Sequence, residues 1–424
     1  MTQGALLNTQ ELPRWRMLIA TIFVMLCTGS TYAFSVFIGP LSTMRDWTAG
    51  DAVLAFAINN AIAPIPMILS GKIVDKGYAR QCILFGGALF GIGYFLSGMA
   101  SSIPMFYLTY GIVCGIGQAF AYSGCLGNAV RLFPDRRGLA VGLVTAGNGG
   151  AAIIMAPALS YLIQHYGVLT ALEALGAVFV VISVIAGLSV TSAPTGYIPK
   201  GWTPPVSAQS TPAIHEGLPW TKMIQTTRFY MILVMFGIGT LSGLMIVSNL
   251  SRIGQSMYGL SATAAAFYVS LYALSNCLGR ILWGAVSDKI GRYYALMVIH
   301  IVVGSMLLVL ANTTLASVFL IAVIGIGLCF GGTMGIMPPI VTENFGAKYY
   351  GVNYGIVFVG YALAAFFGPK VATSVAAANG GNFTIAFYMA FACGVIGLAV
   401  TILYVVMNRK KQSIVDAGRK IEGS

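Results

Sequence analysis

Charged residues are scarce in this sequence of 424 residues, at 8% of the chain, and the scarcity is greatest for acidic ones, with 11 Asp and Glu against 23 Lys and Arg. Soluble globular domains carry roughly one quarter charged residues, so the composition excludes an ordinary soluble protein. The seven cysteines form no CxxC pair and do not cluster with histidine, which argues against a disulfide framework or a metal site. The motifs GxxxxGK[ST], HExxH and GxSxG are also missing. We therefore expect no direct ATP drive, no enzymatic activity, no cofactor and no metal.

Long hydrophobic runs are what the sequence has in abundance, because 58% of its residues are hydrophobic. A bilayer core about 30 Å thick needs roughly 20 apolar residues for each helix that crosses it. Twelve runs reach about that length and predict an all-α membrane protein with twelve transmembrane helices. The runs are 17–38, 52–73, 81–100, 103–129, 138–163, 168–190, 229–250, 262–286, 293–311, 315–341, 352–375 and 383–407.

A polar interval with six prolines separates the first six runs from the last six. Proline at this density cannot sustain a spanning helix, so the interval divides the chain. We predict an N-terminal six-helix bundle over residues 1–190, a cytoplasmic linker over 191–227, a C-terminal six-helix bundle over 228–407 and a basic cytoplasmic tail over 408–424.

The net charge of +12 follows the predicted topology. If the N-terminus is cytoplasmic, nineteen of the 23 basic residues lie on the cytoplasmic side, Arg45, Arg252 and Lys370 lie on the far side, and Arg280 lies within the membrane. The positive-inside rule then places both termini in the cytoplasm. The basicity therefore does not indicate nucleic acid as a partner. The compact loops and the lack of a transit segment favour a bacterial inner membrane, and we expect a monomer in the bilayer.

The two halves repeat each other. Segment 71–76 (GKIVDK) returns as segment 284–289 (GAVSDK), at an offset of 213 residues. In each half the repeat lies in the loop between the second and third helix, and places Asp and Lys four and five residues after Gly. The second copy continues with Gly291 and Arg292, and the first with Gly77 and Arg80.

This repeated loop resembles the signature loop of the major facilitator superfamily. The segment 132–142 (LFPDRRGLAVG), followed by Gly147, resembles a stretch typical of monocarboxylate transporters and the related oxalate/formate antiporter group. The resemblance implies two pseudo-symmetric six-helix bundles that give alternating access to a site near the middle of the membrane.

Arg280 lies in the middle of the eighth run, with no acidic residue nearby in the sequence. A charge at the centre of a bilayer costs about 3 kcal/mol on insertion scales, so it should face a cavity or a partner. A guanidinium matches a carboxylate with two parallel hydrogen bonds, and Arg280 is therefore predicted to anchor an organic carboxylate. The alternatives are that Arg280 reaches the cytoplasmic end of its helix or pairs with a distant carboxylate in the bundle.

Asn276 shares a helix face with Arg280, one turn earlier, and either donates to a substrate oxygen or bridges two helices. The animal monocarboxylate transporters carry an Asp at this position and a Lys in helix 1, and the oxalate/formate antiporter carries a second cation in helix 11. Matching motifs puts Asn276, Val36 and Tyr361 at those three places. A lone cation would leave one carboxylate of a dianion uncompensated, which favours a monoanion such as lactate, pyruvate, glycolate or formate.

Aromatic side chains are predicted to wall the site and confine a short apolar tail. Each of them also fits an ordinary packing role, because aromatic residues are common in this sequence. The predicted wall consists of Tyr32, Phe34, Tyr122, Phe330, Phe358 and Tyr361.

The signature-loop residues are predicted to lock the cytoplasmic face when the carrier opens outward. Their carboxylates either pair with basic residues or sit at helix N-termini, where the helix dipole favours negative charge. The alternative is that the basic members only set the topology. The predicted gate consists of Asp75, Lys76, Arg80, Asp288, Lys289 and Arg292.

Glu173 and His300 are the candidates for proton coupling, because they are titratable groups within predicted spans. Together these features predict a secondary active transporter of a small monocarboxylate, coupled to protons by symport. The alternatives are a carboxylate exchanger of the oxalate/formate type, a carboxylate receptor that does not transport, and an intramembrane enzyme.

Overall fold

The computed structural model describes residues 12–422 except 35, 38–39, 42–46, 48, 195, 201 and 203–216. Arg45 and a large part of the predicted linker therefore lie outside the described residues. Twelve helical segments of the described chain are long and apolar enough to cross a membrane, which confirms the predicted number.

The N-terminal half forms the first six spans. Several spans consist of more than one helical element, as discussed below. The elements are α1 (Arg14–Thr28), η1 (Gly29–Ala33), α3 (Ala49–Ile62), α4 (Pro64–Asp75), α5 (Ala79–Gly98), α6 (Ile103–Phe106), η2 (Tyr107–Val113), α7 (Cys114–Leu132), α8 (Arg137–Tyr166) and α9 (Val168–Leu188).

The C-terminal half forms the other six spans and is preceded by a short helix in the linker, α12 (Trp220–Met223). Its last helix continues without a break through the stretch predicted as a tail. The spanning elements are α13 (Thr227–Tyr258), α14 (Ala262–Ile290), α15 (Arg292–Asn312), α16 (Ala316–Phe345), α17 (Tyr350–Ala378) and α18 (Thr384–Glu422).

Three spans of the N-terminal half are irregular, although the hydrophobic runs predict continuous helices. The first span tightens into a 3-10 helix at Gly29. The second is divided before Pro64, which lacks the N–H that would continue the hydrogen-bond ladder and so begins a new helix, α4. The fourth span passes through seven π-helical residues in η2, and such segments are frequent at functional sites.

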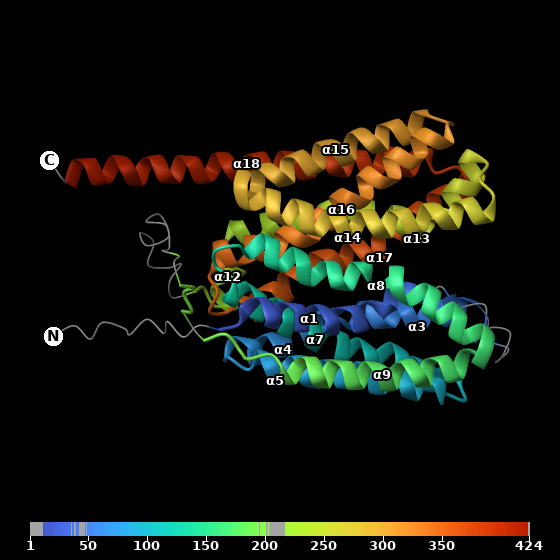
Figure 1. The fold of residues 1–424 in the computed structure, drawn as a ribbon. Helices are drawn as coiled ribbons and strands as arrows, with labels where there is room; N and C mark the ends of the chain where they lie inside the picture. The colour runs from blue at the N-terminus through green and yellow to red at the C-terminus, as the bar shows by residue number, and fades with distance from the viewer. Residues whose placement is uncertain are drawn as a thin grey trace.

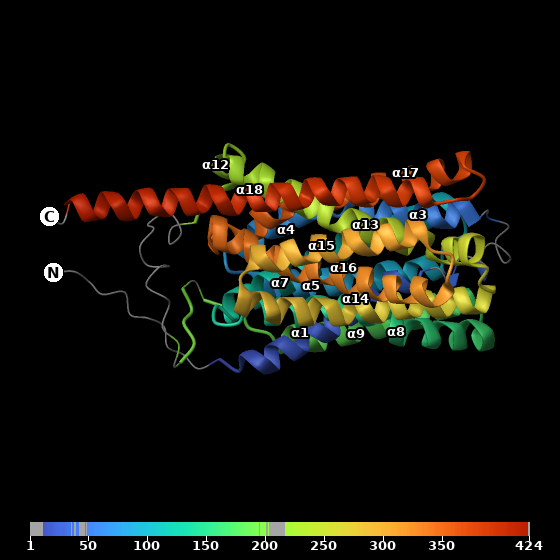
Figure 2. The ribbon, with the colours of Figure 1, turned by 90° about the horizontal axis from the view of Figure 1, so that it is seen from above.

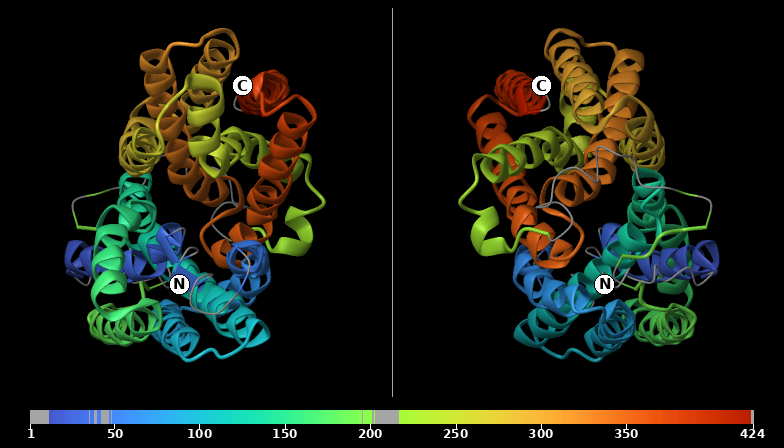
Figure 3. Two further views of the ribbon diagram at one scale, coloured as in Figure 1. Left: turned by 90° about the vertical axis from the view of Figure 1, so that its right-hand side faces the viewer. Right: turned by 90° about the vertical axis from the view of Figure 1, so that its left-hand side faces the viewer.

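The helices lie roughly parallel in two groups, with α1 beginning and α18 ending at the same end of the bundle (Figures 1 and 2). We name this end the termini end and the opposite one the far end. Viewed along the bundle, the N-terminal helices form one group and the C-terminal helices form the other (Figure 3). The main contacts between the groups run along α8 with α14 and along α4 with α17.

The two signature loops turn in the same way. Gly77 and Gly291 both have φ of +94°, a conformation that residues with a Cβ rarely adopt. Each glycine reverses the chain between the second and third span of its half, and so brings Asp75 and Asp288 to the termini end at equivalent positions.

Candidate functional site

Arg280 projects from α14 and is fully buried. Its Nε donates to Asn276 Oδ1 over 3.2 Å, and its Nη1 donates to the Thr145 carbonyl of α8 over 2.8 Å. Its Nη2 is buried and has no hydrogen-bond partner among the described residues. In this structure the guanidinium neither reaches solvent nor pairs with any described carboxylate, so the two alternatives considered above do not describe its position.

Glycines allow two other helices to approach α14 at Arg280. A Cβ on Gly149 of α8 would lie 2.8 Å from Arg280 Nε, and one on Gly142 would lie 2.4 Å from the Arg280 carbonyl. On the opposite side, a Cβ on Gly335 of α16 would lie 2.7 Å from the same carbonyl. Since α8 belongs to the N-terminal half and α14 to the C-terminal half, Arg280 lies where the two halves meet.

The predicted aromatic residues gather around this arginine from both halves. The rings of Tyr122 in α7 and Phe358 in α17 have centroids 6.1 Å apart, and those of Phe358 and Tyr361 are 4.7 Å apart. Tyr361 also interacts through its hydroxyl with Tyr32 of η1. Arg280 lies within electrostatic reach of Tyr122 and Tyr361. The structure thus brings together Arg280, Asn276, Tyr32, Tyr122, Phe358 and Tyr361. Of the other two predicted wall residues, Phe330 stacks on Tyr272, whereas Phe34 packs on Phe56 and Tyr110 instead.

Tyr354 joins this cluster and was not among the predicted residues. It lies in α17, stacks at 6.3 Å from Phe236 of α13, and is within reach of the Arg280 charge. The hydroxyls of Tyr354 and Tyr122 are neighbours and both are buried, yet neither has a partner of good hydrogen-bond geometry in the described chain. Together with Arg280 Nη2, three buried polar atoms remain for a bound polar ligand to satisfy.

At the termini end, each signature-loop aspartate caps a helix of the other half. Asp75 accepts from the backbone N–H groups of Gly351 (2.7 Å) and Val352 (3.0 Å), which open α17. Asp288 accepts from those of Gly138 (3.1 Å) and Leu139 (3.0 Å), which open α8. The N-terminal ends of helices carry partial positive charge and unpaired N–H groups, so both carboxylates are well placed there.

Basic residues complete both caps. Arg131 lies 3.4 Å from Asp75 and also donates to the backbone carbonyls of Ala347 and Lys348 in the other half. Arg292 pairs with Asp288 at 2.5 Å and with Glu343 at 3.0 Å. Arg131 and Glu343 were not predicted as gate residues. In the sequence, Arg131 closely follows the predicted span 103–129, and this position is the signal that could have indicated a role for it at the termini end. The structure places it in the last turn of α7.

Three other predicted gate residues lie outside this cross-half network. Arg80 bonds within its own half, with its backbone N–H to Ser192 Oγ and its Nη2 to the Leu188 carbonyl. Lys76 and Lys289 are exposed at the termini end and make no ion pair with a described residue.

The two candidates for proton coupling lie within helix pairs of a single half. Glu173 of α9 packs against Gly98 of α5. His300 of α15 packs against Gly397 of α18, and its Nδ1 bonds the Leu296 carbonyl. Neither is brought to Arg280. Among the described residues, no group of three or more His, Cys, Asp or Glu side chains could hold a metal ion.

The halves are in backbone contact at the termini end. A Cβ on Gly71 would lie 2.3 Å from the carbonyl carbon of Gly351, and one on Gly284 would lie 2.4 Å from the carbonyl oxygen of Gly138. Such approach is open only to glycine, and it leaves no passage between these helix pairs. The structure is therefore closed between α4 and α17 and between α8 and α14 at this end.

The chain is similar to known proteins in sequence and in fold. A sequence model described as Major Facilitator Superfamily matches residues 17–369. The chain is 28% identical to the oxalate:formate antiporter of Oxalobacter formigenes, over 87% of this chain and 86% of that protein. It is 26% identical to monocarboxylate transporter 12 of Xenopus laevis, over 94% of this chain and 90% of that one.

The fold is similar to that of solved transporters. The proton:xylose symporter XylE superposes with a TM-score of 0.75 at 14% identity, covering 92% of this chain and 96% of XylE. The transporter FucP in its outward conformation superposes with a TM-score of 0.70 at 16% identity, covering 92% of this chain and 98% of FucP. At these identities the likeness concerns the fold alone.

Proposed function

Because this chain belongs to the major facilitator superfamily of membrane transporters, we propose that it is a secondary carrier of a small monocarboxylate whose carboxylate binds Arg280. The observation that carries the proposal is the fully buried guanidinium with an unpartnered Nη2, set among tyrosines and phenylalanines from both halves. A carboxylate there would accept from Nη2 and from the Tyr122 and Tyr354 hydroxyls, and so satisfy three donors that the protein leaves unpaired.

The charge at the site favours a single carboxylate. At the places where the resembling transporters carry further charges, this chain has Val36, Asn276 and Tyr361. A second carboxylate would lose its water without gaining a compensating cation, at a cost of several kcal/mol. The apolar rings of Phe358 and Phe236 suit a short hydrocarbon tail, so lactate and pyruvate are the substrates to test first.

Transport would proceed by alternating access, with the two halves rocking about this site. Opening the termini end requires α8 to separate from α14 and α17 from α4. That motion breaks the Asp75 and Asp288 caps and also the bond from Arg280 Nη1 to the Thr145 carbonyl. Arg280 thus belongs both to the proposed binding site and to the contact between the halves. Binding of a carboxylate to Arg280 would therefore change the strength of that contact.

We place both termini in the cytoplasm of a bacterial cell, as the positive-inside rule indicates. The termini end is then the cytoplasmic end, and the structure is closed toward the cytoplasm. Proton symport is our proposal for the energy source. Exchange of carboxylates is the second candidate, and the 28% identity to a protein named as an oxalate:formate antiporter supports it.

The proposal is tested by uptake of labelled lactate and pyruvate into proteoliposomes containing the wild type, Arg280→Ala or Arg280→Lys. We expect the alanine variant to lose at least 100-fold in Vmax/KM, equivalent to about 2.7 kcal/mol. The lysine variant should recover little, because an ammonium lacks the planar fork of a guanidinium. Uptake by Arg280→Ala at the wild-type rate would refute the assignment of the site.

A further inference from the structure

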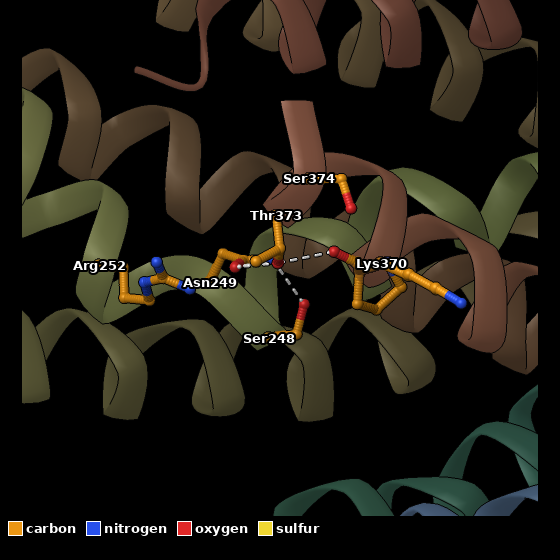
Figure 4. Close-up of a pocket in the computed structure, with 7 residues that line it drawn as sticks. Ser248, Asn249, Arg252, Lys370, Thr373 and Ser374 are labelled. Carbon is orange, nitrogen blue, oxygen red and sulfur yellow. Dashed lines mark hydrogen bonds between the residues drawn. The ribbon is translucent and has the colours of Figure 1, made fainter. Parts of the chain in front are cut away.

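A polar cavity lies between α13 and α17, toward the far end from the Arg280 site. It is open, has a volume of about 380 Å³, and receives two positive charges from Arg252 and Lys370 (Figure 4). The other lining residues are uncharged: Ser248, Asn249, Pro369, Thr373 and Ser374. It is thus a cationic site without an acidic residue in its lining.

Hydrogen bonds among the described residues fix the floor of this cavity. Asn249 is 3% exposed, and its Nδ2 donates to Ser248 Oγ over 3.0 Å and to the Met245 carbonyl over 3.1 Å. The Thr373 hydroxyl lies 3.0 Å from Asn249 Oδ1. These bonds connect α13 to α17 and leave the Ser374 hydroxyl exposed, without a hydrogen-bond partner in the described chain.

The two cations of the cavity lack a counter-charge in the described part of the chain. Neither Arg252 nor Lys370 forms an ion pair there, and Lys370 Nζ lies 5.4 Å from the ring centre of the exposed Phe366. Figure 4 shows them on opposite sides of the Asn249–Thr373 pair. Two cations without a counter-charge give the cavity a positive potential, which favours the binding of an anion.

We propose that this Arg252–Lys370 cavity binds a small carboxylate anion and acts as a capture site on the route from the far end to Arg280. The proposal rests on the proposed function for the identity of the anion. Lys370 is nine residues after Tyr361 in α17, which puts it roughly 13 Å closer to the far end at 1.5 Å per residue. Under the proposed topology an outside substrate reaches these cations before it reaches Arg280.

A capture site of this kind acts on the rate of association. Cationic walls raise the local concentration of an anion, and the effect weakens as salt shortens the range of the field, to about 8 Å at 0.15 M and 3 Å at 1 M. Removing the two charges should therefore lower Vmax/KM at low ionic strength and leave Vmax nearly unchanged. High salt should bring the wild type down to the level of the variant.

The first test measures uptake of labelled lactate into neutral-lipid proteoliposomes at 20 mM and 500 mM salt. We expect Arg252→Gln/Lys370→Gln to lose roughly three- to tenfold in Vmax/KM at low salt, and the difference to vanish at high salt. Arg252→Lys/Lys370→Arg should behave as the wild type. Lys222→Gln, which removes one exposed cation at the termini end, is the matched control and should not change uptake.

The second test measures binding directly, by saturation-transfer NMR of lactate with carriers in neutral-lipid nanodiscs. The Arg280→Gln carrier should retain weak saturable binding, and the triple variant with Arg252→Gln and Lys370→Gln should lose it. This measurement does not require transport. A failure of the proposed transport function can therefore be distinguished from a failure of the capture site. Equal binding by both carriers, or wild-type uptake by the double variant at low salt, would overturn the capture site.

A lipid head group is the other source of an anionic group for this cavity. Repeating both tests with phosphatidylglycerol in the membrane distinguishes it from free carboxylate. If the double variant differs from the wild type only when the anionic lipid is present, the cavity is a lipid site and the capture proposal is wrong.

Discussion

At the scale of single residues, Arg280 gives only two of its three guanidinium nitrogens to the protein. Nε and Nη1 are bonded to Asn276 and Thr145, whereas Nη2 is buried without a partner in the described chain. An unsatisfied buried donor costs about 1–3 kcal/mol, and more when it is charged. A fold that keeps such a donor beside two unpartnered tyrosine hydroxyls has the property expected of a binding site, since a ligand can offset that cost.

Tyr122→Phe and Tyr354→Phe test whether these hydroxyls serve a ligand. A hydrogen bond to a charged group contributes about 1.5–3 kcal/mol, so each variant should raise the KM for lactate by roughly ten- to 100-fold. The stability of the protein should change little, because each change deletes a buried hydroxyl that has no partner of good hydrogen-bond geometry in the described chain. The readouts are the substrate dependence of uptake and the thermal unfolding of the purified carrier.

Tyr258→Phe provides the opposite control. Its hydroxyl donates to the Leu310 carbonyl over 2.9 Å, away from Arg280, so its loss should lower the unfolding temperature and leave KM unchanged. If neither Tyr122→Phe nor Tyr354→Phe changes KM, the two tyrosines are packing residues only.

Some residues of the candidate site could be predicted from the sequence and others could not, for physical reasons. Arg280 is visible because a charge in an apolar run is costly and therefore rare. Tyr354 shares a helix face with Phe358 and Tyr361, at spacings of four and seven, but it is one of 21 tyrosines and nothing local distinguishes it. The Thr145 carbonyl could not be predicted, because every residue has a carbonyl and only the tertiary fold selects this one.

At the scale of elements, the contacts between the halves at the termini end are made by helix ends. Each signature-loop aspartate lies at the C-terminal end of one helix and caps the N-terminus of a helix in the other half. The interaction of a carboxylate with a helix N-terminus contributes about 0.3–2 kcal/mol, which is enough to bias two conformations without locking either. This strength suits the proposed role, in which the contact breaks in every transport cycle.

Asp75→Asn and Asp288→Asn test this role. Each removes the negative charge but keeps an oxygen acceptor, so we expect Vmax to fall roughly two- to tenfold with little change in KM. Hydrogen exchange should quicken at residues 351–352 in the first variant and at 138–139 in the second. Asp135→Asn is the matched control, because Asp135 pairs with Arg14 of its own half. Unchanged exchange at the capped amides would contradict the assignment.

The number of helices follows from hydrophobic length, whereas their interruptions do not. Twelve apolar runs predict twelve spans because each must cross the same bilayer. The π-helical segment at 107–113 and the 3-10 turn at 29–33 lie inside apolar runs without a charge to mark them. Their geometry depends on neighbouring helices, as at Gly29, where a Cβ would lie 2.2 Å from the Asn148 carbonyl oxygen of α8.

At the scale of the whole molecule, the internal repeat predicts two similar halves but not how they meet. The structure shows them meeting through equivalent helix pairs, α4 with α17 and α14 with α8, at Gly71–Gly351 and Gly284–Gly138. The first and third of these glycines are copies of each other in the repeat. The pseudo-symmetry of the sequence is thus also the symmetry of the contacts between the halves at the termini end.

The energy source is a property of the entire cycle and distinguishes the two candidate functions. For symport, the carrier must return across the membrane without a carboxylate, so a proton gradient with acid outside should raise lactate uptake into lactate-free proteoliposomes roughly tenfold. A protonophore should abolish the increase, and uptake should not require lactate inside. For exchange, the loaded carrier alone returns, so internal lactate should accelerate uptake and the gradient should not.

Because Asn276 stands where the resembling transporters carry a carboxyl group, we expect the proton to travel with the substrate carboxylate itself. Symport should then track the concentration of lactic acid as external pH falls, and acceleration by internal lactate alone would refute it.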